Sequence, residues 1–219
     1  MTNLATTGSA RVRARHEVAA AADLRSAGVL LFVLAAAFLI VTMLAASIAP
    51  DYDFKEGAIS DLGVIDQTAL LFNGLLVGMG VLNIAAGYLF FRSHRRRWLL
   101  GLYVIAGIGT IGAGLFPLDT GGLHATFALV AFVVYNLEGL GTAALVAGPI
   151  RSLGFIAGAI GLIYTVLMVI GDSGNTAVFG PYGHGGSERM IAYPVMAWLI
   201  ALGGYLMAGR TSEQGLSAR

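Results

Sequence analysis

Six long apolar runs alternate with short polar segments along the chain. Each run is close to the ~20 residues that a helix needs to cross the hydrocarbon core of a bilayer. Within each run the apolar residues are continuous and do not alternate with polar ones, which favours helices over the strands of a closed barrel. We therefore predict membrane-spanning helices over residues 27–49, 69–91, 98–116, 123–147, 153–171 and 188–208.

The segments outside these runs predict the domain organisation. A basic N-terminal tail over residues 1–26, which we expect to be flexible, precedes one transmembrane domain over residues 27–208, and a short tail over residues 209–219 follows it. The first run is longer than the about 7–15 apolar residues of a secretory signal, so we expect it to stay in the protein as a span. The predicted fold class is all-α, a polytopic six-helix transmembrane bundle.

The placement of basic residues orients this bundle. The chain has 13 lysines and arginines, and all except Lys55 and Arg189 lie in the two tails or in the connections after the second and fourth spans. Because cytoplasmic segments carry the excess of basic residues, we predict that both termini are cytoplasmic. The expected location is the plasma membrane, with the lipid bilayer as the main partner.

Composition supports this class and removes several others. Hydrophobic residues make up 57% of the chain and charged residues 11%, and the mean hydropathy is +0.80. Soluble domains carry about 25% charged residues. The absence of cysteine excludes disulfides, thiol catalysis and cysteine-ligated zinc. The sequence contains no basic patch that would indicate a nucleic-acid partner. We expect neither haem nor a nucleotide as a cofactor.

Glycines inside the spans predict how the helices pack. Gly74 and Gly78 are four residues apart in the second span, as are Gly154 and Gly158 in the fifth, so each pair lies on one helix face. Helices in lipid associate through close backbone packing, and we expect both faces to contact a neighbouring helix.

Candidate chemistry begins in "AISDLG", which precedes the second span and contains Ser60 and Asp61. One interpretation is structural, because either side chain can cap a short helix by accepting a backbone N–H. The other is a serine–acid pair that faces the extracytoplasmic mouth of the bundle. The local sequence favours the cap.

The stretch "FPLDTGGLHATF" places His124 on the first turn of the fourth helix, about one turn from Asp119. The positive end of the helix dipole favours a neutral imidazole there. Metal ligation and general-base catalysis both need a neutral imidazole. The alternative is a histidine that bonds a backbone carbonyl.

The stretch "YGHGGSERMIAYP" precedes the sixth span. Gly185 and Gly186 argue against a continuous helix from His184, and Ser187 is a good N-cap that would put Glu188 on the first helical turn. Arg189 lies at the membrane rim against the charge bias, and such an arginine usually has an acidic partner. The expected partners are Asp61, Asp119 and Glu188.

Three polar residues lie inside predicted spans: Asn83, Asn136 and Glu138. A charged acid at that depth costs at least about 2.5–3.5 kcal/mol, so Glu138 should be protonated or paired. It is either a functional carboxyl or a structural one that bonds Asn83 and locks two helices together.

The motifs "SDLG", "FPLDTGGLH" and "GGSERMIAYP" resemble, in this order, an uncharacterised bacterial and archaeal membrane family, domain of unknown function 998. The resemblance covers nearly all six spans and implies no reaction. The matching positions are Ser60, Asp61, Pro117, His124, His184, Glu188 and Arg189. A weaker resemblance is to alkaline ceramidases and progestin/adiponectin-type receptors, which combine a serine, an aspartate and three histidines around zinc. Here Glu188 stands where a further histidine would be needed, and the chain has six predicted helices instead of seven.

Three functions fit these features. The first, slightly favoured, is a hydrolase or transferase that acts on a lipid or amphipathic substrate at the extracytoplasmic face. Its catalytic candidates are Ser60, Asp61, His124 and Glu188. Its substrate-binding candidates are Asp119, Tyr182 and Arg189, the last as a clamp for an anionic headgroup. A zinc version would use His124, His184 and Glu188 as ligands.

The second function is a small transporter or ion-coupled binding protein with Glu138, Asn136 and Asn83 at mid-membrane, which predicts a polar path from the mouth to Glu138. Six spans are few for a transporter, so a homo-oligomer is expected in that case. The third is a structural or regulatory membrane protein, in which the polar residues only cap helices and close the bundle.

Overall fold

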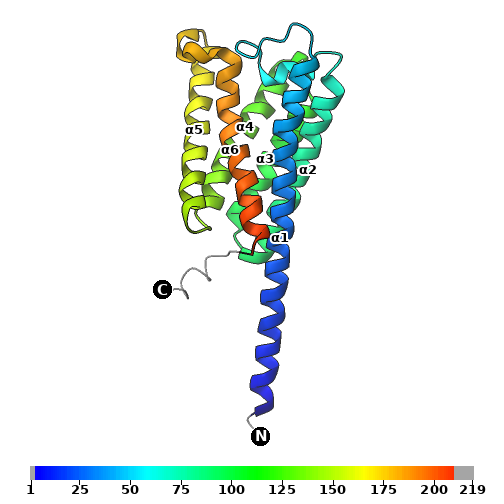
Figure 1. The fold of residues 1–219 in the computed structure, drawn as a ribbon, viewed down its shortest axis with the longest axis vertical. Helices are drawn as coiled ribbons and strands as arrows, with labels where there is room; N and C mark the ends of the chain where they lie inside the picture. The colour runs from blue at the N-terminus through cyan, green and yellow to red at the C-terminus, as the bar shows by residue number, and fades with distance from the viewer. Residues whose placement is uncertain (1–2, 210–219) are drawn as a thin grey trace.

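The computed structural model describes the backbone of residues 3–209 and the side chains of residues 14–209. Six long α-helices form one bundle (Figure 1). All six are long and apolar enough to cross a membrane, and the described residues contain no strand, so the predicted all-α six-helix bundle is confirmed. The helices are α1 Asn3–Ile48, α2 Ala69–His94, α3 Arg97–Leu115, α4 Gly122–Ala143, α5 Pro149–Asp172 and α6 Gly183–Met207.

The helix bounds differ most from the prediction at the start of α1, and they also differ at the end of α4. Helix α1 begins at Asn3 instead of residue 27, and its N-terminal part extends beyond the other five helices (Figure 1). The described part of the predicted tail is therefore helical, whereas residues 210–219 lie outside the described residues. Helix α4 ends at Ala143 instead of residue 147, and after a turn Gly148 with φ 78° precedes Pro149, which opens α5.

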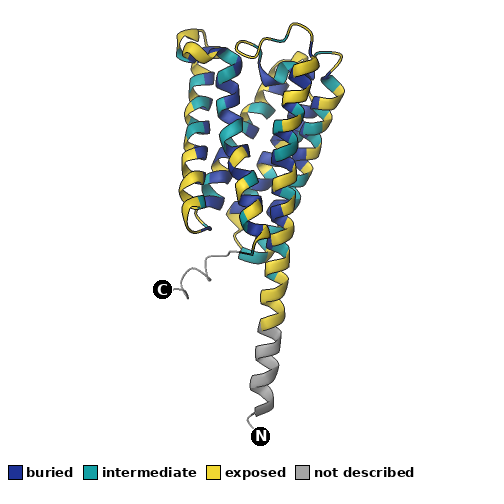
Figure 2. Ribbon diagram, viewed as in Figure 1, coloured by how far each residue is buried: buried dark blue, intermediate teal, exposed yellow. Residues whose placement is uncertain are grey.

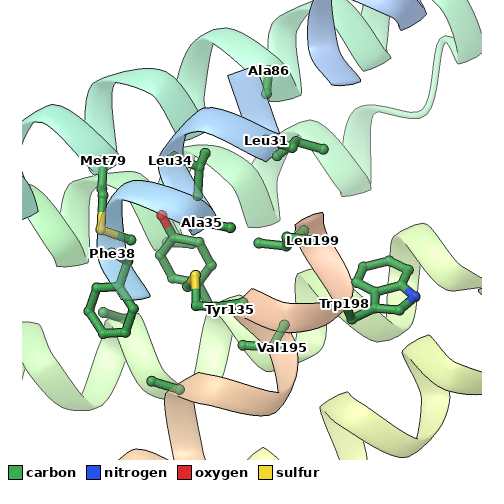
Figure 3. Close-up of a cluster of buried hydrophobic side chains, with 14 of the residues drawn as sticks. Leu31, Leu34, Ala35, Phe38, Met79, Ala86, Tyr135, Val195, Trp198 and Leu199 are labelled. Carbon is green, nitrogen blue, oxygen red and sulfur yellow. The ribbon is translucent and has the colours of Figure 1, made fainter. Parts of the chain in front are cut away.

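The helices form a closed ring in which each packs against its neighbours in the sequence, and α1 also packs against α6. The buried faces turn inward and the exposed faces outward (Figure 2). Many exposed residues are large and apolar; Leu70, for example, is 89% exposed, as expected for a surface that faces lipid. Figure 3 shows part of the interior, where side chains of α1, α2, α4 and α6 meet. They include Leu31, Leu34, Phe38, Met79, Tyr135, Val195, Trp198 and Leu199.

Small residues allow this close packing on some helices and not on others. A Cβ at Gly154 would collide with Trp198 at 2.6 Å, and one at Gly158 with Leu140 at 2.8 Å, so the predicted packing role of this α5 face is confirmed. A Cβ at Gly74 or Gly78 would meet nothing within 4 Å. The prediction for this face of α2 is wrong within the described residues, because it lies on the outside of the ring.

The two ends of the bundle differ in character. The connections that contain three short 3₁₀ helices lie together at one end, which we call the loop end (Figure 1). These helices are η1 Ile59–Gly63, η2 Leu118–Thr120 and η3 Thr176–Tyr182. The opposite end, the arginine end, carries the short connections after α2 and α4, and there Arg92 pairs with Asp23 at 3.1 Å.

Candidate functional site

The long connection between α1 and α2 folds over the loop end. Ile59 and Leu62 lie three residues apart in η1, so they share one face of this 3₁₀ helix and are buried against the bundle. Asp61 accepts a hydrogen bond from the N–H of Ala58 at 2.8 Å, and the Thr68 hydroxyl donates to the carbonyl of Leu62 at 2.7 Å. Asp61 therefore caps η1, as the local sequence favours.

Arg189 holds the same connection to α6. Its Nη1 donates to the carbonyls of Phe54 and Gly57, each at 3.1 Å, and its Nη2 donates to the Tyr52 hydroxyl at 2.6 Å. The guanidinium also lies 4.5 Å from the centre of the Phe54 ring. Tyr52 donates in turn to the carbonyl of Ala58, and burial raises its pKa to about 12.

The prediction that Arg189 has an acidic partner is wrong. No carboxylate of the described residues forms an ion pair with it, because neutral oxygens surround the guanidinium. Arg189 therefore positions the α1–α2 connection, and it lines neither the groove nor the cavity described below.

The start of α6 also differs from the prediction, since the helix runs without a break from Gly183 through Gly185 and Gly186. The carbonyl of Gly57 lies where a Cβ of residue 185 would stand, so only glycine allows this approach. The N–H of Gly186 donates to the carbonyl of Lys55 at 3.2 Å. The predicted cap at Ser187 is wrong, because its hydroxyl donates back within the helix to Gly183 at 2.8 Å.

A continuous helix brings His184 and Glu188 onto one face, four residues apart. Both line a groove of about 680 Å³ at the loop end, between η1, α4, α5 and α6. Its polar lining consists mainly of Ser60, Asp61, His124, Thr165, Asp172, Ser173, His184 and Glu188. Its apolar lining includes Leu129 on α4 and Val169 on α5, which are 43% and 52% exposed on the outside of the bundle.

A smaller cavity of about 70 Å³ lies inside the bundle next to this groove. Most of its lining is apolar and comes from α1, α2, α4 and α6, with Phe38, Met79 and Val195 among the contributors. Three polar residues line both the groove and the cavity: Ser60, His124 and Glu188. We call these three the neck residues.

Each neck residue has hydrogen-bonding capacity that the protein leaves unused. A carbonyl only accepts hydrogen bonds, so His124 Nδ1 must be the donor to Phe116 at 2.8 Å, and in the neutral ring Nε2 then carries a lone pair. Glu188 Oε2 accepts from the N–H of Ile59. No described residue bonds His124 Nε2, Glu188 Oε1 or Ser60 Oγ, and none of these atoms is among those sealed from solvent.

Other predicted site residues lie apart from the neck. Asp119 and Tyr182 are exposed, Tyr182 by 56%, and neither lines the groove or the cavity. His184 Nε2 pairs with Asp172 at 3.1 Å. Among the described residues no three histidines, aspartates or glutamates lie close enough to hold a metal ion, so His124, His184 and Glu188 do not form the predicted zinc site.

The intramembrane polar residues form structural contacts. Asn83 Nδ2 donates to Glu138 Oε2 at 2.7 Å and to the carbonyl of Tyr103 at 3.1 Å, and Glu138 is fully buried. This is the predicted bond that links α2 to α4. Asn136 points elsewhere and donates to the carbonyl of Ile191 at 3.2 Å. Glu138 does not line the interior cavity.

The sequence interpretation missed Asp172 and Tyr52. Asp172 is the last residue of α5, and its position at the end of an apolar run was the available signal for a residue at the rim. Tyr52 carried no signal, because its role depends on the position of Arg189, which is 137 residues away in the sequence.

The fold and the neck together define a multi-pass membrane protein with a polar, partly open site at one end of its bundle. A family model described as "Protein of unknown function (DUF998)" matches residues 27–205. The chain belongs to this family, as the three quoted motifs predict. No curated protein and no solved structure matches the chain, so the weaker resemblance to ceramidase-type hydrolases has no support.

Proposed function

We propose that this protein is a membrane-embedded hydrolase or transferase that acts on an amphipathic substrate at the extracytoplasmic face of the plasma membrane. The observation that carries the proposal is the neck. Three polar side chains from η1, α4 and α6 lie between an open groove and an apolar cavity, and each has a free hydrogen-bonding atom.

His124 is the proposed general base. The bond from Nδ1 to the Phe116 carbonyl fixes the ring and the tautomer, so that Nε2 is available to take a proton. That proton comes from the attacking hydroxyl, which belongs to Ser60 or to a water molecule, and His124 then returns it to the leaving group. Glu188 lies on the same neck and stabilises or orients the reacting groups.

The lining suits a substrate with a polar head and an apolar body. The groove is about 680 Å³, within the usual size of ligand sites, and its apolar wall is open on the outside of the bundle where lipid lies. A substrate can therefore enter sideways from the bilayer between α4 and α5. The cavity of about 70 Å³ has room for several methylene groups at the end of an apolar chain.

The other two functions are less well supported. A transporter that uses Glu138 needs a polar path from the mouth, and the interior cavity is mostly apolar and does not reach Glu138. A purely structural protein explains Asp61 and Arg189, which hold the α1–α2 connection. It does not explain why the three neck residues keep unused hydrogen-bonding atoms beside a groove.

The test measures turnover by purified protein in a nonionic detergent. A panel of coumarin esters and amides with short, medium and long acyl chains provides the substrates. We expect turnover that increases with chain length and falls about 10²–10⁴-fold in His124→Ala, the usual effect of removing a general base. His16→Ala is the matched control, because His16 is exposed at the arginine end.

Labelling with an alkyl fluorophosphonate decides the nucleophile. Labelling that Ser60→Ala abolishes identifies Ser60, whereas His124-dependent turnover without labelling identifies water. Wild-type turnover in the His124→Ala protein, or no turnover of any ester or amide by the wild-type protein, would overturn the proposal.

A further inference from the structure

The titratable lining of the groove consists of carboxyl groups and the two histidines His124 and His184. Three carboxyl groups line it, those of Asp61, Asp172 and Glu188, and no described lysine or arginine does. Asp61 accepts the Ala58 N–H, and Asp172 pairs with His184. Two of the three therefore have a clear role within the fold. Glu188 differs from both.

Glu188 is a buried carboxyl that forms no ion pair with any described residue. Its residue is 5% exposed, and its one protein partner among the described residues is the Ile59 N–H. Arg189 follows it in the sequence but bonds carbonyls and Tyr52. Burying a charge is costly unless it is paired, and the free oxygen of Glu188 opens onto the groove and the cavity. A cation in the groove would provide the missing partner.

We infer that the groove binds the positively charged nitrogen of an amphiphile, either an amine or a quaternary ammonium group, with Glu188 as its counter-ion. The apolar part of the same molecule lies along Leu129 and Val169 or enters the interior cavity. The inference rests on the proposed function where it assigns the substrate class. It replaces the anionic headgroup expected from Arg189, whose guanidinium does not line the groove.

The test is a binding measurement that needs no turnover. Purified protein in a maltoside detergent is titrated with four probes, and the shift of its thermal unfolding midpoint is recorded. Three probes share a dodecyl chain and carry a trimethylammonium, a hydroxyl or a sulfate head. The fourth is tetramethylammonium, which has no chain. We expect the largest upward shift with dodecyltrimethylammonium, and the weakest with the sulfate.

Two variants connect this result to the site. Glu188→Gln keeps an oxygen that can accept from Ile59 and should weaken binding of dodecyltrimethylammonium by at least about tenfold, because it removes a buried counter-ion. Asp172→Asn, which alters a second carboxyl of the groove, should weaken binding less. Asp66→Asn is the matched control. Asp66 is exposed on the α1–α2 connection and lines neither the groove nor the cavity.

Equal shifts with the ammonium and sulfate probes, or binding that Glu188→Gln leaves unchanged, would overturn the inference. Equal affinity for tetramethylammonium alone would overturn its amphipathic part and indicate a site for a small soluble cation. Cation binding that persists while His124→Ala retains full turnover would refute the proposed enzyme and keep this inference, so the two failures are distinguishable.

Discussion

Replacement of Arg189 by methionine tests whether this side chain fastens the α1–α2 connection to α6. Methionine keeps much of the apolar volume and removes every donor. The wild-type guanidinium makes three hydrogen bonds to the connection, to the carbonyls of Phe54 and Gly57 and to the Tyr52 hydroxyl. We expect Arg189→Met to increase the local opening of residues 51–58, while the helices stay packed.

The expected cost follows from these three bonds. A hydrogen bond to a charged group contributes about 1.5–3 kcal/mol net. Three bonds at the low end give about 4.5 kcal/mol, and we reduce this to about 3 kcal/mol because such bonds are not fully additive and Phe54 is exposed enough for water to replace part of the loss. Since each 1.4 kcal/mol is a factor of ten, the opening equilibrium of the connection should increase about 10²-fold.

Hydrogen–deuterium exchange followed by mass spectrometry measures this opening. The N–H of Gly57, which donates to the Asp53 carbonyl at 2.7 Å, should exchange about 10²-fold faster in Arg189→Met, while peptides from α2 and α3 keep their wild-type rates. Arg151→Met is the matched control, because Arg151 is exposed at the arginine end and only stacks on Phe155. Wild-type exchange of residues 51–58 in Arg189→Met would show that the connection does not depend on Arg189.

Two further predictions concern the same fold. The pKa of Tyr52 is raised from 10.0 to about 12, so the fold favours the neutral phenol; its stabilising effect is present below pH 10 and is lost as the pH rises from 10 to 12. The wild-type protein should therefore lose thermal stability over this interval, and Tyr52→Phe should lose less; identical pH profiles would contradict this. Gly161→Ala should destabilise the protein by about 1–3 kcal/mol through overpacking, because the Asn136 amide fills the position of the new Cβ. Gly78→Ala, which meets open space on α2, should be neutral or more stable by up to about 1 kcal/mol, and the reverse order of unfolding midpoints would contradict the described packing.

The number, type and approximate positions of the helices could be predicted because one physical quantity, the thickness of the hydrocarbon core, sets the length of each apolar run. The start of α6 could not. Two glycines in "GHGG" argue against a helix locally, but the helix begins there because the Gly57 carbonyl approaches Gly185 and the Lys55 carbonyl accepts from Gly186. Both contacts come from a connection more than a hundred residues earlier in the sequence.

The candidate site was predictable in part for a similar reason. Loops on one side of a membrane must gather at one end of a bundle, so Ser60, His124 and Glu188 could be expected near each other. Which way a rim side chain points depends on packing between distant segments. Asp119 and Tyr182 have the same polar character and similar positions, and both are exposed away from the groove.

The pair Glu188 and Arg189 shows why adjacency in the sequence misleads on a helix. Consecutive residues are about 100° apart around the axis, so neighbouring side chains do not face each other. Arg189 therefore reaches the α1–α2 connection, where its Nη atoms donate to carbonyls and to Tyr52, and Glu188 reaches the neck. An ion pair between these two residues would have neutralised both charges at this end of the bundle. Neutral oxygens bind the arginine instead, so Glu188 forms no ion pair among the described residues, and one of its oxygens stays free beside the groove where the proposed ammonium group would bind.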